Sequence, residues 1–170
     1  MAGKAVTSKE LGPALGMYSH GMTVPAGEIV IVAGQVGTNR AGEVAGSGDV
    51  VAQTTQAFEN VRAVLTAAGC AMTDVVRFQT FLTHATDVDG FMQARRELFP
   101  RYFPGGVYPP NTLLIISRLV KPELLVEIEA MAVKPARPAP PAARPRARSK
   151  TRPTAKSRGS GRSRRSGKRR

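Results

Sequence analysis

The composition of the chain changes abruptly after Lys134, and this change limits what the chain can fold into. Residues 135–170 contain no Leu, Ile, Val, Phe or Tyr, and they carry 14 Lys and Arg without any Asp or Glu. A segment with so little apolar surface cannot offset a backbone ordering cost of about 1–2 kcal/mol per residue. We therefore predict one folded domain over residues 1–134 and a disordered tail, rich in Pro, Ala, Arg and Ser, over residues 135–170.

The formal charge of +13 belongs to this tail, because residues 1–134 hold 11 of the 25 basic residues and all 12 acidic ones. Non-specific contact of residues 135–170 with DNA or RNA, driven by counterion release, is therefore one expectation. The alternative is an extension that only improves solubility. The tail has no aromatic residues on which bases could stack, which argues against specific recognition of single strands.

Cysteine usage and hydropathy indicate the cellular setting. The N-terminal residues lack the apolar core of a signal peptide, and no stretch approaches about 18 uninterrupted apolar residues. A single cysteine, Cys70, rules out an internal disulfide and suits a reducing compartment. With two histidines and no CxxC or HxxxH spacing, the sequence predicts neither a metal site nor a cofactor. We expect a cytoplasmic protein without membrane contact.

Apolar runs separated by turn residues predict the order strand, helix, strand, helix, strand, strand. Strands are predicted over residues 27–36, 75–82 and 124–133 and from Asn111 onward, and helices over residues 49–68 and 91–103. Asp49 is the expected cap of the first helix and Gly69 its stop, whereas Pro100 should kink or end the second. This order predicts an α+β fold, a mixed sheet with both helices on one face.

The second face of that sheet also needs a cover. In the strands over residues 75–82 and 124–133, apolar side chains occur at positions that point to either face of the sheet. Neither face is therefore expected to be fully solvated. A body of this length has too few helices to cover both faces by itself. We therefore predict a homo-oligomer.

Four stretches together carry a family resemblance: LGMYSHG, IVIVAGQVG, QTTQAFENVRAVLTAAGCAMTDVVRFQTFLT and RLVKPELLVEIEAMAV. In this combination they resemble the Rid/YjgF family, the reactive intermediate deaminases that are also labelled L-PSP endoribonucleases. The resemblance covers roughly residues 15–133, which is nearly the whole body. It implies a chorismate-mutase-like fold, a homotrimer with pockets between subunits, and hydrolysis of enamines and imines such as 2-aminoacrylate to a keto acid and ammonia.

The resemblance also implies which residues form the site. Tyr18 matches the family's pocket tyrosine and Glu127 the glutamate that positions the attacking water, so both are catalytic candidates. Gly34 matches the glycine of the AGQ turn. Asn111 falls where the family carries an arginine that holds the substrate carboxylate, because the usual P-x-R-[ST] reads PPNT here. Asn111, Gly34 and Thr112 are the substrate-binding candidates.

The asparagine alters the expected ligand. Arginine offers five donors and a fixed charge, whereas Asn111 offers a neutral amide. Losing the cation costs about 2–5 kcal/mol in binding a carboxylate. The expected ligand is therefore a small neutral or weakly charged imine, enamine or carbonyl metabolite. Two alternatives stay open: a catalytically silent binding module that the tail tethers to nucleic acid, or a pocket in which Arg95 or Arg96 replaces the missing arginine.

Simpler roles for these residues stay open as well. Asn111 could be a turn residue bonded to its own backbone. Glu127 and Glu129 alternate with apolar residues and point to one sheet face, where an ion pair with Arg118 is the structural alternative to chemistry. His20 follows Tyr18 by two residues and shares its face if the segment is extended, so it is a further pocket candidate.

Overall fold

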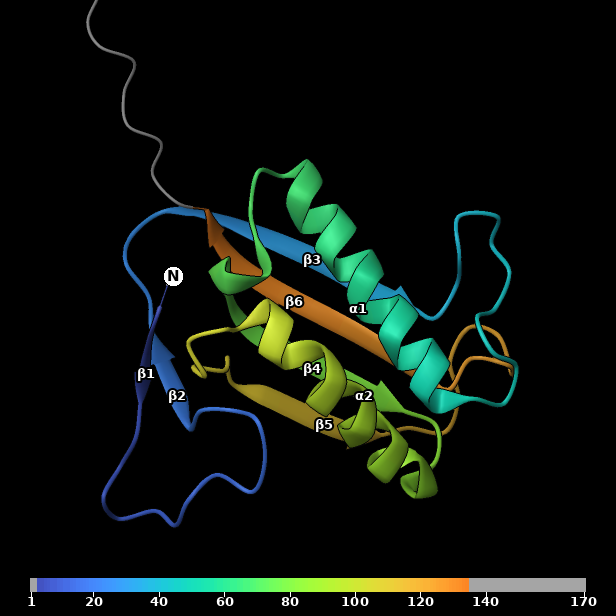
Figure 1. Cartoon of the computed structure of the whole chain (residues 1–170), viewed down its shortest axis with the longest axis horizontal. Coiled ribbons are helices and arrows are strands. Elements are labelled where there is room, and N and C mark those ends of the chain that lie inside the picture. Colours follow the sequence, from blue (N-terminus) through green and yellow to red (C-terminus); the bar gives the residue numbers. More distant parts are fainter. Residues whose placement is uncertain (1–2, 135–170) are drawn as a thin grey trace, which may run out of the picture. The chain divides into compact units, whose positions relative to one another are not determined.

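The computed structural model describes residues 3–134 (Figure 1). The predicted tail lies outside these residues, so its disorder, its boundary and its contact with nucleic acid stay predictions. The elements are β1 (Lys4–Val6), β2 (Gly21–Thr23), β3 (Glu28–Val36), α1 (Val50–Ala67), β4 (Val75–Leu82), α2 (Val88–Tyr102), β5 (Asn111–Ile115) and β6 (Val126–Lys134), with 3₁₀ turns at Met72–Asp74 and Ala85–Asp87.

The main sheet has the strand order β3-β6-β4-β5. β6 runs antiparallel to both β3 and β4, whereas β4 and β5 are parallel. Both helices lie on the same side of this sheet, α1 over β3 and β6 and α2 over β4 and β5 (Figure 1). The prediction of an α+β fold with a mixed sheet and two helices on one face is thus confirmed. β1 and β2 form a separate two-stranded sheet that the sequence did not predict.

Capping residues set the ends of α1 as predicted. The Asp49 side chain accepts hydrogen bonds from the backbone N–H groups of Val51 and Ala52, at 2.9 and 3.1 Å. Gly69, beyond the other end, has φ of +79°, a conformation that glycine adopts without strain.

The second helix, predicted over residues 91–103 and to be kinked or ended by Pro100, is α2, which begins earlier, at Val88, and continues past Pro100 to Tyr102. The expectation that Pro100 ends the helix is therefore wrong, and a kink stays a prediction. Pro100 lies in the last turn, where its missing N–H removes only a bond near the helix end. The last strand also begins later than predicted, at Val126.

Aromatic side chains fill the space between the helices and the sheet. Phe58 of α1 packs edge-on against Phe78 of β4 and Phe99 of α2, with ring centroids 5.6 and 5.3 Å apart. All three side chains are at most 1% exposed. This cluster buries part of the apolar face of each helix and contributes to the stability of the domain.

The opposite side of the sheet carries no helix or strand within residues 3–134 (Figure 1). We call this side the open face; its residues are Ile29, Ile31, Arg77, Gln79, Phe81, Thr112, Leu114, Glu127, Glu129 and Met131. Ile31 is 74% exposed and Ile29 59% exposed. The uncovered face agrees with the reasoning that predicted self-association, and the oligomer itself stays a prediction.

Candidate functional site

Gly34 and Glu127 lie in contact, at a bulge where β3 and β6 change register. The pairing of the two strands shifts between Val32 and Gln35, so Gly34 sits in the irregular part of β3. A Cβ atom at Gly34 would overlap the Glu127 carboxylate. Two of the residues predicted for the site are therefore neighbours, and glycine at position 34 is what makes room for the carboxylate.

The Glu127 carboxylate forms no ion pair or side-chain hydrogen bond within residues 3–134. Burial raises its pKa, and the neighbouring Glu129 raises it further. The Arg118 guanidinium instead donates to the Leu119 carbonyl at 3.3 Å, so the interpretation of Glu127 as half of an ion pair with Arg118 is wrong. A carboxylate with a raised pKa and no fixed partner accepts a proton more readily than an ordinary carboxylate, which suits a general base.

Asn111 lies at the start of β5 on the helix-covered side of the sheet. Its side-chain oxygen accepts a hydrogen bond from the Thr80 hydroxyl at 3.0 Å, and Thr80 is completely buried. The interpretation of Asn111 as a turn residue bonded to its own backbone is therefore wrong. Its amide nitrogen donates no hydrogen bond within residues 3–134, so both N–H groups remain free for a ligand.

The predicted substrate-binding residue Thr112 is exposed and turns the other way. It pairs with Gln79 of β4 and so belongs to the open face. Asn111 and Glu127 consequently lie on opposite faces of the sheet within one chain. A single cleft containing both requires a second subunit.

Tyr18 and His20 lie in the segment that precedes β2. The Tyr18 hydroxyl accepts a hydrogen bond from the Leu15 N–H at 3.3 Å, and the Tyr18 and His20 ring centroids are 6.5 Å apart. The Ser19 hydroxyl donates to the Tyr108 carbonyl at 2.6 Å. This bond ties the segment to the loop that leads into Asn111, so Tyr18, His20 and Asn111 belong to one side of the domain.

Arg95 is buried and supports the same segment. It is 2% exposed, donates to the Met17 carbonyl, and places its guanidinium carbon 4.4 Å from the centre of the Phe99 ring. Burial lowers its pKa to about 10, so it stays protonated at neutral pH. Arg96, one residue further along α2, is exposed and belongs to the outer side of the helix.

Sequence reasoning missed two polar residues of the open face, Arg77 and Gln79. They line a groove of about 210 Å³ together with Ile31, Val32, Ala33, Glu129, Ala130 and Met131. The signal was present, because strand alternation places Arg77, Gln79 and Phe81 on one face. It did not reveal that this face is the one that carries Glu127 and Glu129, since the pairing of β4 with β6 is a long-range property.

Within residues 3–134 the structure has no group of three or more His, Cys, Asp or Glu side chains arranged to hold a metal ion. The helices of the same region are too short or too polar to span a bilayer.

The arrangement of sheet and helices, with a glutamate against a strand-bulge glycine, is that of a Rid-type protein. The model of the family described as endoribonuclease L-PSP matches residues 8–134. Protein DfrA of Myxococcus xanthus is 37% identical over 133 residues, which cover 78% of this chain and 97% of that protein. The 2-iminobutanoate/2-iminopropanoate deaminase of Escherichia coli K12 is 30% identical over 132 residues, covering 77% and 98%.

Solved structures agree with these relatives. The crystal structure of the Rid family protein YyfB from Yersinia pestis matches with a TM-score of 0.70 at 30% identity, over 78% of this chain and 99% of that one. The chain therefore belongs to the endoribonuclease L-PSP family, the Rid/YjgF family that its motifs resemble.

Proposed function

We propose that this protein is a homotrimeric imine or enamine hydrolase whose substrate is a small neutral or weakly charged metabolite. The observation that carries the proposal is the Glu127 carboxyl group, which lies against Gly34, has no partner among residues 3–134, and has a raised pKa. The 30% sequence identity with a relative named 2-iminobutanoate/2-iminopropanoate deaminase supports this class of reaction.

The proposed reaction adds water to a carbon–nitrogen double bond. Glu127 takes a proton from water while the water oxygen bonds to the imine carbon, and the imine nitrogen gains a proton. The C–N bond of the resulting carbinolamine then breaks, so ammonia leaves and a carbonyl compound remains. An enamine first gains a proton at carbon and loses one from nitrogen, which converts it to the imine. Tyr18 is the second proposed catalytic group, with its hydroxyl as a donor to the substrate.

The site is proposed to form between subunits. Glu127 lies on the open face, whereas Asn111 and Tyr18 belong to the helix-covered side of the chain. A neighbour whose open face meets this side would bring Glu127 to Asn111. The exposed side chains of Ile29 and Ile31 support such an assembly, because large apolar groups on an uncovered sheet face favour association.

Asn111 is proposed to select the substrate. Because Thr80 occupies its side-chain oxygen, its amide N–H groups are the part available to a ligand, and they suit a carbonyl or other neutral acceptor. Arg95 can replace the missing cation only if it leaves the Met17 carbonyl that it now contacts. We therefore expect 2-imino acids to be poor substrates.

The test compares ammonia release from freshly generated 2-aminoacrylate and from an uncharged imine of similar size. We expect the wild-type protein to hydrolyse the uncharged imine faster than 2-aminoacrylate. The rate of Asn111→Arg on 2-aminoacrylate should rise at least about tenfold, which corresponds to 1.4 kcal/mol. Glu127→Gln should lose both activities. Equal rates on 2-aminoacrylate for wild type and Asn111→Arg would contradict the role of Asn111. Full activity of Glu127→Gln would overturn the proposed hydrolase mechanism.

A binding module without chemistry is the second candidate, favoured by the neutral Asn111 amide and its bond to Thr80. It predicts binding of a small metabolite without ammonia release. In this case residues 135–170 are proposed to attach the trimer to DNA or RNA, three tails acting together. A gel shift that survives deletion of residues 135–170 would exclude that attachment.

A further inference from the structure

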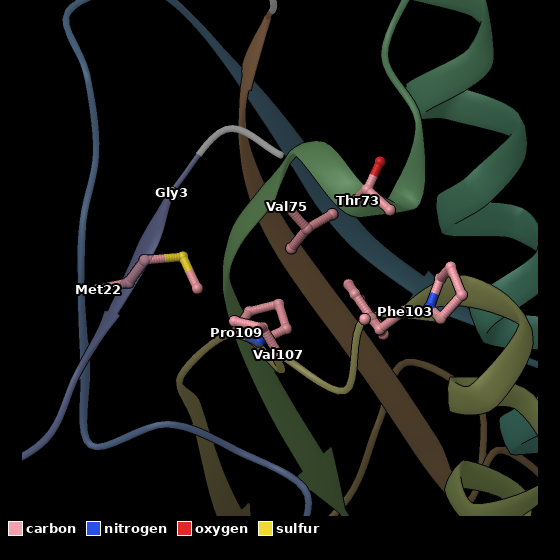
Figure 2. Close-up of a pocket in the computed structure, with 9 residues that line it drawn as sticks. Gly3, Met22, Thr73, Val75, Phe103, Val107 and Pro109 are labelled. Carbon is pink, nitrogen blue, oxygen red and sulfur yellow. The ribbon is translucent and has the colours of Figure 1, made fainter.

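A second region of the domain contains an apolar cavity of about 220 Å³ that is partly open to solvent (Figure 2). Three parts of the chain wall it: the β1–β2 pair, the start of β4 with the turn before it, and the loop after α2. The lining residues are Gly3, Met22, Thr73, Val75, Phe103, Pro104, Gly105, Val107 and Pro109.

The wall formed by the loop after α2 is rigid. Phe103 packs edge-on against Phe99 and Phe78, with ring centroids 5.1 and 6.3 Å apart. The Gly106 N–H donates to the Phe103 carbonyl at 2.9 Å, with Gly106 at φ of +66°. The aromatic cluster thus holds this wall in place, which prevents the cavity from closing from that side.

The wall formed by β1 and β2 is adjustable. These strands hydrogen-bond to each other and to no strand of the main sheet. The Met22 side chain lies directly over Gly3, where a Cβ atom would overlap its thioether. Methionine is unbranched and fits irregular spaces, so Met22 can adapt to what enters the cavity.

The lining sets the chemistry of an occupant. Among residues 3–134, no charged side chain lines the cavity, and Thr73 is the one lining residue with a polar side chain. Its hydroxyl oxygen points away from Met22 and Pro109 (Figure 2). A charged group placed here would lose part of its hydration without gaining a partner among the lining side chains, which is costly, whereas an apolar molecule gains by removing its own surface and that of the lining from water.

The cavity is remote from Glu127, the proposed catalytic acid, although its lining residue Pro109 lies two residues before Asn111. Val75 of β4 pairs with Ala132, and Phe81 pairs with Glu127. Six residues of strand correspond to about 20 Å. Val75 also points to the helix-covered side, whereas Glu127 lies on the open face.

We propose that this cavity is a binding site for a small, uncharged, hydrophobic molecule with a single ring or a branched aliphatic chain. The rigid aromatic wall provides a fixed contact surface, and Met22 closes over the ligand from the other side. Nothing in this binding requires imine hydrolysis, so the proposal stands or fails apart from the proposed function.

The experiment titrates the full-length chain with toluene and with benzene while the methyl NMR signals of Met22, Val75 and Val107 are followed. Benzylamine, protonated at neutral pH, is the charged comparison. We expect saturable shifts of these methyl signals for the two neutral probes and at least tenfold weaker binding of benzylamine. Val107→Phe, which fills the cavity, should weaken toluene binding at least tenfold.

Val120→Phe is the matched control, because Val120 is 76% exposed and lies outside the cavity. It should bind toluene like the wild type. Met22→Trp is a second filling variant in case Val107→Phe does not fold, and circular dichroism checks both. The proposal is overturned if the neutral probes leave the three methyl signals unshifted, or if folded filling variants bind toluene as tightly as the Val120→Phe control.

Discussion

Each face of the sheet holds an ionisable group that is poorly solvated, and the two groups differ in whether the chain provides them with partners. On the helix-covered face Arg95 is compensated within the chain by the Phe99 ring and the Met17 carbonyl. On the open face Glu127 has no such partner within residues 3–134. Arg95 is therefore compensated within one chain, whereas Glu127 is not. We expect Arg95 and the aromatic cluster to contribute to stability, and Glu127 to contribute to chemistry and assembly.

The largest effect is expected for the activity of Glu127→Gln. The variant keeps the shape of the side chain and removes the proton acceptor, so kcat/KM on the uncharged imine should fall about 10²- to 10⁴-fold. Glu129→Gln on the same face is the matched control and should lose less than about tenfold, because Glu129 does not contact Gly34. The activities are measured as ammonia release in the steady state. An equal loss of activity in both variants would mean that any acidic side chain on this face supports the reaction and that the position of Glu127 is not special.

Phenylalanine truncation on each face compares their contributions to stability. Phe58→Ala should lower the free energy of unfolding by about 3–5 kcal/mol, because it opens a cavity in the fully buried cluster. Phe81→Ala on the open face should cost less than about 1.5 kcal/mol in the dissociated protein and should instead weaken association. Urea unfolding and sedimentation velocity measure the two effects. Similar losses of unfolding free energy for both variants would remove the distinction between the faces.

Arg95→Met tests whether the buried cation is a support for the segment around Tyr18. Methionine fills the space and removes a charge that has no acidic partner in the described part of the chain, so the unfolding free energy should change by less than about 2 kcal/mol. The backbone around Met17 and Tyr18 should exchange its amide hydrogens faster, because the bond to the Met17 carbonyl is lost. Unchanged exchange in this segment would show that Arg95 does not hold it.

The smallest expected effect is the pH dependence of stability at Glu127. Because its pKa is raised in the folded state, the folded chain holds this proton more tightly, and stability is lost as pH rises through the folded pKa. Glu127→Gln lacks this loss. Its unfolding free energy relative to wild type should rise from about pH 4.3, the ordinary value of a glutamate, and level off above the folded pKa. A difference that stays constant with pH would mean that assembly supplies a partner for the carboxylate.

Local signals made much of the fold predictable. Asp49 and Gly69 set the ends of α1, and the alternation of β4 and β6 set their faces, because caps and side-chain direction depend on residues close in sequence. β1 and β2 escaped prediction because three-residue strands show no alternation. Pro100 was misjudged because its effect depends on where the helix would have ended anyway.

The sequence by itself determined the order of the elements, the position of the chemistry-bearing residues and the neutral side chain at position 111. Only the tertiary structure decided that Gly34 contacts Glu127, that Thr80 bonds Asn111, that Arg95 is buried and that Asn111 and Glu127 occupy opposite faces. The Gly34–Glu127 and Thr80–Asn111 contacts join residues about 90 and about 30 positions apart in the chain, as the registers of β3, β4, β5 and β6 dictate, whereas Arg95 is buried by the contact of α2 with the segment around Met17. Register depends on the packing of the whole sheet, which no local pattern encodes.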